Sequence, residues 1–381
     1  MNYRKFGKDK DKVSILGFGC MRLPVVDNKY ENINEAEATM MLRYAIDKGV
    51  NYIDTAYPYH GGNSETFLGK ALKNGYRDKV FIATKSPSWL IEKHEDLDRF
   101  LDEQLLKLQT DYIDYYLLHA LNKKYWNNYL KLNVFDFVNR ALKSGKIRNI
   151  GFSFHDEYEV FEEIINYYKW DFCQIQLNYY DEDYQAGLKG LKLAGSKGID
   201  VVIMEPLRGG RLATNVPNEV QEVFDSSKSF HSAAGWALRY LWNYDEVKVI
   251  LSGMNNYEHI DDNIDEASIA KVNMLGDEEK SIIKKVKDIY KSRIKVDCTN
   301  CKYCMPCPHG VNIPGCFELY NNASVFDAFE QYKKWYRLGM KPEEWASCCQ
   351  ECGLCESKCP QNIEIINELK RVAEYFEKEE V

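Results

Sequence analysis

Residues 51–75, NYIDTAYPYHGGNSETFLGKALKNG, contain one copy of the pattern that decides the fold. The first four residues are expected to form a buried strand that ends at Asp54. A loop follows, and the stretch SETFLGKALKNG after it has a helical pattern. Its last residue, Gly75, suits the left-handed turn that ends a helix. The segment therefore predicts one strand–loop–helix unit of a parallel sheet.

The same unit recurs along the chain, where short β-rich runs alternate with longer helix-like stretches. We expect strands at Val13–Gly17, Asn51–Asp54, Val80–Thr84, Tyr112–His119, Ile147–Gly151, Phe172–Leu177, Asp200–Met204 and Val247–Leu251. Eight such units in roughly 280 residues fit a closed (β/α)8 TIM barrel. A doubly wound sheet is the alternative, but no G-x-G-x-x-G follows the first strand, and the lone GFG there is a weak signal.

The composition is that of an ordinary globular protein, with 45% hydrophobic and 28% charged residues among 381. The net charge of −8 disfavours non-specific binding to nucleic acid or to an anionic membrane, so we expect neither as a partner. No apolar run is long enough to cross a bilayer, and the first residues lack the apolar segment of a secretory signal. We therefore expect a cytoplasmic protein.

The cysteines are unevenly distributed, because ten of the twelve lie between Cys298 and Cys359. This indicates a second domain, and we expect a barrel of residues 1–290 followed by a cysteine-rich domain of residues 291–381. In a reducing compartment, such a density of cysteines favours metal ligands or redox groups over disulfides.

Polar residues end or directly follow three consecutive predicted strands: Asp54, Lys85 and His119. Chemistry in a parallel barrel lies where the strands end, so we expect these side chains to converge with Tyr59 from the loop after Asp54. The set suits carbonyl reduction, in which hydride reaches carbon and an acid protonates oxygen. Lys85 is expected to lower the pKa of Tyr59 by about one to three units, Asp54 to hold Lys85, and His119 to orient the carbonyl oxygen. Taken singly, each of these four residues could have an ordinary role in packing, in helix capping or at the solvated surface. Their joint placement at consecutive strand ends is hard to explain by such roles.

At these residues the sequence resembles the aldo-keto reductases. The resemblance rests on NYIDTAYPYHGGNSETFLGKAL, VFIATK, DYIDYYLLH, GKIRNIGFS, QIQLNYY, EPLRGGRL and SGMNNYEHIDDNI, which cover nearly all of residues 1–270 in the family's order. It implies a (β/α)8 barrel that binds NADPH or NADH in an extended form without a Gly-rich phosphate loop. It also implies that Asp54, Tyr59, Lys85 and His119 are the catalytic set, with Tyr59 as the acid in reduction and the base in oxidation.

The resemblance further implies which residues surround the cofactor. Those near the nicotinamide are Gly19, Cys20, Met21, Asp54, Ser153, Gln174 and Met204; those near the pyrophosphate are Pro206, Leu207 and Gly209; those near the adenosine are Gly253, Met254, Asn255, His259, Asp262 and Asn263. Ser153 and Gln174 are expected to bond the carboxamide. Phe154 stands where many members have Asn, and His259 replaces the arginine that commonly binds the 2′-phosphate, which leaves NADP and NAD as alternatives.

The cysteine-rich segment contains two similar runs. One is Cys349-x2-Cys352-x2-Cys355-x3-Cys359-Pro, the bacterial ferredoxin pattern, and the other is Cys298-x2-Cys301-x2-Cys304-x2-Cys307-Pro, one residue shorter in its last gap. Together they resemble a two-cluster 4Fe–4S ferredoxin module of the mainly helical kind. The resemblance implies crossed ligand sets, which are Cys298, Cys301, Cys304 and Cys359 for one cluster and Cys349, Cys352, Cys355 and Cys307 for the other. A single cluster and a zinc site remain alternatives, although zinc is usually bound by paired ligands.

These features lead to two hypotheses about function. The first is an NAD(P)H-dependent oxidoreductase that interconverts a small carbonyl compound and its alcohol by direct hydride transfer, with a fused iron–sulfur module. Tyr57, His60 and Trp89 are then candidate walls of the substrate pocket. The second is an electron-transfer or redox-sensing protein that uses the barrel as a nicotinamide-binding scaffold, with an external ferredoxin or flavoprotein as a candidate partner.

Overall fold

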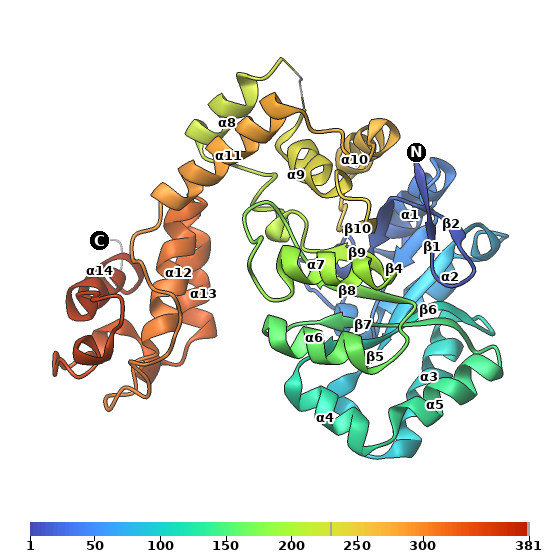
Figure 1. The fold of residues 1–381 in the computed structure, drawn as a ribbon, viewed down its shortest axis with the longest axis horizontal. Helices are drawn as coiled ribbons and strands as arrows, with labels where there is room; N and C mark the ends of the chain where they lie inside the picture. The colour runs from blue at the N-terminus through green and yellow to red at the C-terminus, as the bar shows by residue number, and fades with distance from the viewer. Residues whose placement is uncertain (229–230, 379–381) are drawn as a thin grey trace. The chain divides into compact units, whose positions relative to one another are not determined.

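The computed structural model describes residues 1–228 and 231–378. Its contacts divide the chain into two compact units, one of residues 1–213 and 231–277 and the other of residues 214–230 and 278–381. In Figure 1, the second unit contains the orange and red helices together with the yellow-green helix α8 (Asn218–Asp225), and the first contains the other labelled strands and helices. We describe each unit by itself.

The first unit is a closed parallel barrel, as the alternating pattern predicts (Figure 1). The eight strands follow the order β10-β3-β4-β5-β6-β7-β8-β9. They are β3 (Leu16–Gly19), β4 (Tyr52–Asp54), β5 (Phe81–Ser86), β6 (Ile113–Leu121), β7 (Ile147–Phe154), β8 (Phe172–Gln176), β9 (Asp200–Met204) and β10 (Val247–Ser252). The doubly wound alternative is therefore excluded.

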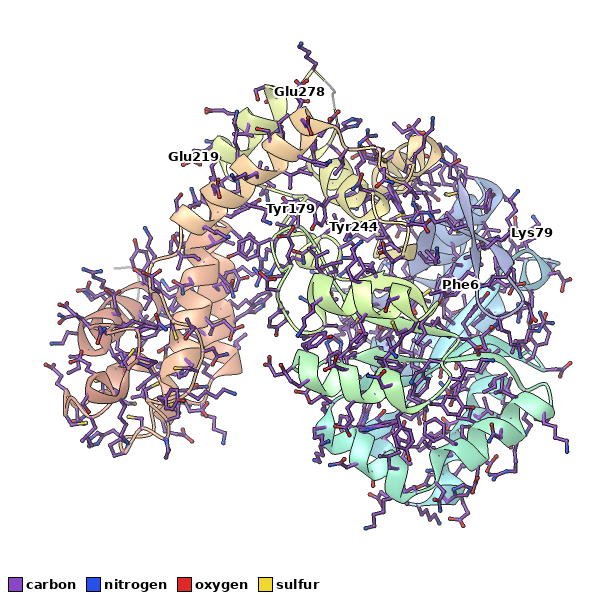
Figure 2. All side chains as sticks on the ribbon, viewed as in Figure 1. Phe6, Lys79, Tyr179, Glu219, Tyr244 and Glu278 are labelled. Atoms are coloured by element: carbon purple, nitrogen blue, oxygen red, sulfur yellow. The ribbon has the colours of Figure 1, made fainter. Side chains whose placement is uncertain are left out.

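The prediction of the first strand was wrong. The run that we assigned to one strand at Val13–Gly17 is divided between β2 (Asp11–Ser14) and β3, and β2 pairs with β1 (Tyr3–Phe6) in an antiparallel hairpin outside the barrel. Both strands are apolar where they meet the barrel, so the sequence shows one continuous run. Phe6 of the hairpin (Figure 2) is fully buried and lies against the barrel rings of Tyr52 and Tyr115 at 5.7 and 4.6 Å. The hairpin thereby closes the end of the barrel opposite the carboxyl ends of its strands.

Helices follow the barrel strands. They are α1 (Glu35–Asp47), α2 (Ser64–Ala71), α3 (His94–Leu108), α4 (Lys123–Lys131), α5 (Val134–Lys143), α6 (Tyr158–Tyr167), α7 (Gly187–Ser196), α9 (Ala233–Trp242) and α10 (Tyr257–Ile269). The sequence predicted a helix stop at Gly75, which has the positive φ that glycine tolerates, at 83°. Gly49, just after α1, has a positive φ of 100° as well.

The strand register places the predicted polar residues at one end of the barrel. Side chains two residues apart on a strand share a face, so a residue two positions beyond a core residue lies above it. Tyr52, Ala83 and Leu117 belong to the same buried cluster inside the barrel. Asp54, Lys85 and His119 each follow one of these residues by two positions on β4, β5 and β6. All three therefore face the barrel mouth at the carboxyl ends of adjacent strands.

The described part of the second unit is helical. Its helices are α8 (Asn218–Asp225), α11 (Asp277–Ser292), α12 (Ile313–Val325), α13 (Phe329–Gly339) and α14 (Ile365–Phe376). Phe317, Tyr336 and Leu369, from α12, α13 and α14, form much of its buried core. Within residues 1–228 and 231–378, no helix combines the length and the apolar character that crossing a membrane requires.

Candidate active site and metal centre

A buried ion pair forms the floor of the barrel mouth. Lys85 Nζ lies 2.7 Å from Asp54 Oδ1 and donates a second hydrogen bond of 2.7 Å to the backbone oxygen of Thr55. The two charged side chains are 1% and 3% exposed. Tyr59 begins a short helical turn after β4, and the lysine Nζ is 5.1 Å from the centre of its ring. The ammonium is thus held between a carboxylate and a phenol.

His119 borders the same space. Its ring lies edge-to-face with Tyr59 at a centroid distance of 6.4 Å, and the ring of Trp89 is 5.2 Å away. The Nδ1 atom of His119 is buried and has no hydrogen-bond partner among the residues that the structure describes. All four residues that the sequence analysis grouped therefore meet at one mouth.

The electrostatics differ from our expectation for Tyr59. Burial raises the pKa of the Tyr59 hydroxyl, and Lys85 counters only part of that shift, so the net direction is upward. The expected net lowering was wrong because burial of the phenol cannot be read from spacing. Burial also acts to lower the pKa of Lys85, but Asp54 and Tyr59 together raise it. Burial, Lys85 and His155 lower the pKa of His119 well below its ordinary value, so its imidazole is neutral.

A buried polar network behind Lys85 was missed by the sequence analysis. The carboxylate of Glu65 on α2 accepts hydrogen bonds from Thr84 Oγ1 at 2.6 Å and from Gln104 Nε2 at 2.5 Å. Gln104 Nε2 also lies 3.1 Å from the backbone oxygen of Lys85. Because all of these side chains are fully buried, helices α2 and α3 hold β5 in place at the lysine. The only sequence signal was the presence of two polar residues on the buried faces of predicted helices.

The two residues expected at the nicotinamide carboxamide offer complementary groups. Ser153 Oγ accepts a 2.7 Å hydrogen bond from the Ala120 amide, which leaves the serine proton able to donate. Gln174 Oε1 is buried and without a partner in residues 1–228 and 231–378, so it can accept. An amide needs one donor for its oxygen and one acceptor for its nitrogen, and these residues provide both. Phe154 instead packs against Phe161 of α6, with ring centres 5.2 Å apart.

The other residues expected at the cofactor differ in their solvent exposure. Cys20 and Met254 are buried, and Gly19, Met204, Leu207 and Asp262 are partly buried. The exposed members are Met21, Gly209, Gly253, Asn255 and His259. Pro206 is buried, and Asn263 is also buried with its amide bonded to Ser252 Oγ at 2.8 Å.

The sequence analysis did not include Arg22, whose guanidinium lies 3.7 Å from Glu205. A Cβ atom on Gly209 or Gly253 would approach Arg22 to 3.4 or 3.0 Å. Arg22 therefore lies between the loops that follow β9 and β10.

Two of the three proposed pocket walls lie elsewhere. His60 is fully buried, with Nδ1 2.6 Å from the backbone oxygen of Tyr30 and Nε2 accepting from the Leu23 amide at 3.3 Å. Tyr57 is directed to α3, where its hydroxyl bonds Glu103 at 3.1 Å. Trp89 lies beside His119 and is 39% exposed, so it borders the mouth.

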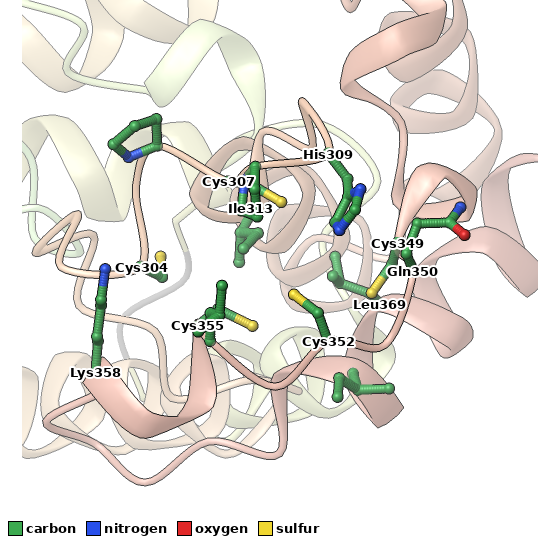
Figure 3. A pocket seen from close by; sticks show the side chains of 14 residues that line it. Cys304, Cys307, His309, Ile313, Cys349, Gln350, Cys352, Cys355, Lys358 and Leu369 are labelled. Atoms are coloured by element: carbon green, nitrogen blue, oxygen red, sulfur yellow. The ribbon is translucent and has the colours of Figure 1, made fainter.

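Five cysteines from both runs line one cavity of about 240 Å³ in the second unit. They are Cys304, which belongs to the other crossed set, and Cys307, Cys349, Cys352 and Cys355. Figure 3 shows the sulfur atoms of Cys307, Cys352 and Cys355 directed toward the space between them. Cys307, Cys349, Cys352 and Cys355 are one of the two crossed sets that the resemblance implies, and they lie around one cavity although 42 positions separate Cys307 from Cys349.

The other crossed set lines a second, smaller cavity, which contains Cys298, Cys301, Cys304 and Cys359. Cys301 and Cys359 also influence the pKa values of Cys298 and Cys304, which places the four thiols near one another. Among the residues described, no three or more Cys, His, Asp or Glu side chains are close enough to hold a single metal ion. Four cysteine thiolates around a cavity suit a cubane cluster, which takes four cysteine ligands.

Comparison with known proteins identifies the class. A closed barrel whose mouth holds this tetrad is typical of an oxidoreductase, and the profile of the aldo/keto reductase family matches residues 15–288. The chain belongs to the aldo/keto reductase family. A 4Fe-4S dicluster domain profile matches residues 297–366, so the second unit is of the iron–sulfur cluster-binding type.

Individual relatives support the barrel. L-galactose dehydrogenase of Arabidopsis thaliana is 27% identical over 300 residues, which are 73% of this chain and 91% of the relative. An aldo-keto reductase of Bacillus halodurans, solved in its holo form, is 25% identical with a TM-score of 0.62, over 75% of this chain and 96% of its own. An aldo-keto reductase of Klebsiella pneumoniae, solved with NADPH, is 22% identical with a TM-score of 0.62 over 75% of this chain and 95% of its own, a likeness in fold alone.

Proposed function

We propose that this protein is an NAD(P)H-dependent oxidoreductase that interconverts a small carbonyl compound and its alcohol, with Tyr59 as the proton donor. The observation that carries the proposal is the position of Lys85, 2.7 Å from the Asp54 carboxylate and 5.1 Å from the Tyr59 ring. His119 borders the same space, and its Nδ1 atom has no hydrogen-bond partner among the residues described. A buried phenol, ammonium and neutral imidazole at one mouth suit the protonation of an oxygen that gains negative charge.

Each of the four residues at the barrel mouth has its own role in the proton transfer. Tyr59 is protonated at neutral pH because burial raises its pKa, so the acid is in its donor form before reaction. His119 is neutral and can donate a hydrogen bond to the carbonyl oxygen, which orients it toward the Tyr59 hydroxyl. When the proton leaves Tyr59, the phenolate is stabilised by the Lys85 ammonium, whose charge Asp54 maintains.

The nicotinamide cofactor fits the residues present. Ser153 and Gln174 would hold the carboxamide through one donated and one accepted hydrogen bond, which is supported by the buried, unpartnered Gln174 Oε1. A reduced nicotinamide bound there supplies a hydride to the carbonyl carbon. The relative from Bacillus halodurans was solved in a holo form, which supports cofactor binding by a barrel of this kind.

We propose that the crossed cysteine sets bind two 4Fe–4S clusters, which supply single-electron chemistry when bound. Cys301 and Cys352 are exposed, one in each set, and this favours electron exchange with an external ferredoxin or flavoprotein.

The second candidate function, electron transfer or redox sensing with the barrel as a scaffold, is supported by the same exposure of Cys301 and Cys352. Anaerobic protein with counted iron and sulfide tests it, because bleaching of the visible spectrum by NADPH or NADH alone would favour this second function.

The Tyr59→Phe variant tests the proposal. With a panel of small aldehydes and ketones and either NADPH or NADH, we expect kcat to fall by about 10²–10⁴-fold, the usual contribution of a general acid. Tyr57→Phe is the matched control, because Tyr57 is directed to α3 and should leave the rate near that of the unmodified protein. A Tyr59→Phe protein that reduces carbonyls at the original rate would exclude Tyr59 as the acid.

A further inference from the structure

The loop between β3 and α1, residues 20–34, begins with two residues expected at the nicotinamide, Cys20 and Met21. Its outer part is a small hairpin, in which Val25 pairs with Ile33. The hairpin holds the two arms of the loop together. It does not by itself fix the loop at the barrel mouth, so contacts with the mouth must do so.

A buried histidine joins this loop to the turn that carries Tyr59. His60 directly follows Tyr59 in the chain and is fully buried. Its Nδ1 atom lies 2.6 Å from the backbone oxygen of Tyr30, and its Nε2 atom lies 3.3 Å from the amide nitrogen of Leu23. The ring of Tyr30 also stacks on that of His60, with centres 4.6 Å apart and planes at 20°. His60 therefore holds the loop at two points, one before the hairpin and one within it.

The partners of His60 define its tautomer and its charge. A backbone oxygen can only accept, so Nδ1 carries a proton, and an amide can only donate, so Nε2 carries none. The neutral ring with its proton on Nδ1 satisfies both partners. Burial lowers the pKa of His60, against smaller opposing effects of the Tyr30 and Cys20 backbones, so the ring is neutral at neutral pH.

The backbone of His60 is unusual for a residue with a side chain. Its φ of 53° and ψ of 45° are left-handed, a region that residues other than glycine seldom occupy. Such a conformation persists where the surrounding structure holds it. Here it places the imidazole on the loop while the neighbouring Tyr59 ring stays beside Lys85.

We propose that His60 is a positioning residue that holds the loop of residues 20–34 against the Tyr59 turn, so that the nicotinamide side of the cofactor site is ordered before the cofactor binds. A loop that is loose in the free protein must be ordered at the moment of binding, and this lowers the affinity for the cofactor. The contact of Tyr59 with Lys85 does not involve this loop, so proton transfer should be affected far less. The role of His60 rests on the cofactor site of the proposed function and adds the residue that fixes one of its walls.

The affinity for NADPH and NADH, measured by anaerobic titration calorimetry, tests the proposal. We expect His60→Leu to raise the Kd about tenfold, because both hydrogen bonds to the loop are lost, with a much smaller fall in kcat at saturating cofactor. His60→Asn keeps a donor near the position of Nδ1, and His60→Gln keeps an acceptor near that of Nε2, so each should raise the Kd only about threefold.

His94→Leu is the matched control. The Nδ1 atom of His94 lies 2.7 Å from the backbone oxygen of Leu132, so this variant also removes a bond from an imidazole to a backbone oxygen. That bond joins α3 to the residue after α4, and neither residue is expected at the cofactor. The Kd of His94→Leu should equal that of the unmodified protein.

The outcomes separate the role of His60 from the proposed function. A folded His60→Leu protein that binds the cofactor as tightly as the unmodified protein would overturn this role and leave the proposed function intact. If His60→Leu does not fold, an unmodified Kd in both His60→Asn and His60→Gln would overturn the role as well. A purely structural role would lower the stability of the His60 variants and leave the Kd of the folded protein unchanged, which also contradicts the proposal. An unmodified protein that binds neither NADPH nor NADH would overturn the proposed function, and the role of His60 with it.

Discussion

Replacing Lys85 by methionine should destabilise the barrel in a manner that depends on pH. The ammonium is 1% exposed and compensates the 3% exposed carboxylate of Asp54 at 2.7 Å. Breaking a buried ion pair by removing one partner typically costs about 3–5 kcal/mol of unfolding free energy. Burial already raises the pKa of Asp54, and Lys85 is what opposes that shift, so the Asp54 pKa rises further in Lys85→Met.

The sign of the pH dependence follows from this raised pKa. A carboxyl whose folded pKa exceeds its unfolded value binds a proton more tightly in the folded state, so stability is lost as pH rises above the unfolded pKa, near 3.9 for aspartate. We therefore expect Lys85→Met to cost about 3–5 kcal/mol at pH 8 and clearly less at pH 5. The measurement is anaerobic urea unfolding followed by tryptophan fluorescence, with the unmodified protein unfolded at each pH.

The double variant Asp54→Asn/Lys85→Met provides the matched control. Removing both charges leaves no buried ion, so most of the lost stability should return, and the pH dependence should disappear. A cost that is equal at pH 5 and pH 8, or a double variant less stable than Lys85→Met, would refute the reasoning.

Three further predictions follow from the two sites. Cys352→Ser should lose about half of the bound iron and sulfide, because one of two clusters loses a ligand, whereas Cys316→Ser should keep both, since Cys316 is buried outside the two cavities. Gln174→Ala should raise the KM for NADPH or NADH about tenfold with a smaller change in kcat, because a carboxamide contact acts on binding; an equal fall in kcat would contradict this. The rate of reduction should show no loss assignable to Tyr59 between pH 6 and pH 9, because its pKa lies above the ordinary value of about 10; a tyrosine-dependent fall near pH 8, absent from matched solvent controls, would contradict the upward shift.

The sequence predicted the positions of the tetrad well because strand ends are marked in it. Buried parallel strands are continuous apolar runs, so a polar residue at the end of FIATK or YYLLH stands out, and the parallel register then brings the two together. The crossed cysteine sets were implied by the resemblance to two-cluster ferredoxin modules, which rests on the spacing of the two cysteine runs. The structure places both sets around cavities.

Other features depend on three-dimensional surroundings that spacing does not record. The apolar run at Val13–Gly17 belongs to two strands because a turn at Gly7 folds the first residues under the barrel. His60 sits within the mouth motif, yet the loop turns it inward onto the Tyr30 carbonyl. The Glu65–Gln104 network joins two helices through buried polar contacts, and no local pattern in either helix predicts the partner in the other.

The upward shift of the Tyr59 pKa changes how the role of Lys85 should be understood. If Lys85 made the phenol acidic in the resting protein, part of Tyr59 would be ionised and unable to donate. Because burial keeps the phenol protonated, the lysine charge gains most of its favourable interaction when the proton leaves and the phenolate forms. An interaction that is stronger in the transition state than in the ground state lowers the barrier, whereas one of equal strength in both does not. The buried ion pair with Asp54 therefore costs stability at rest and contributes to catalysis, because it keeps a positive charge in place for the moment at which the proton is transferred.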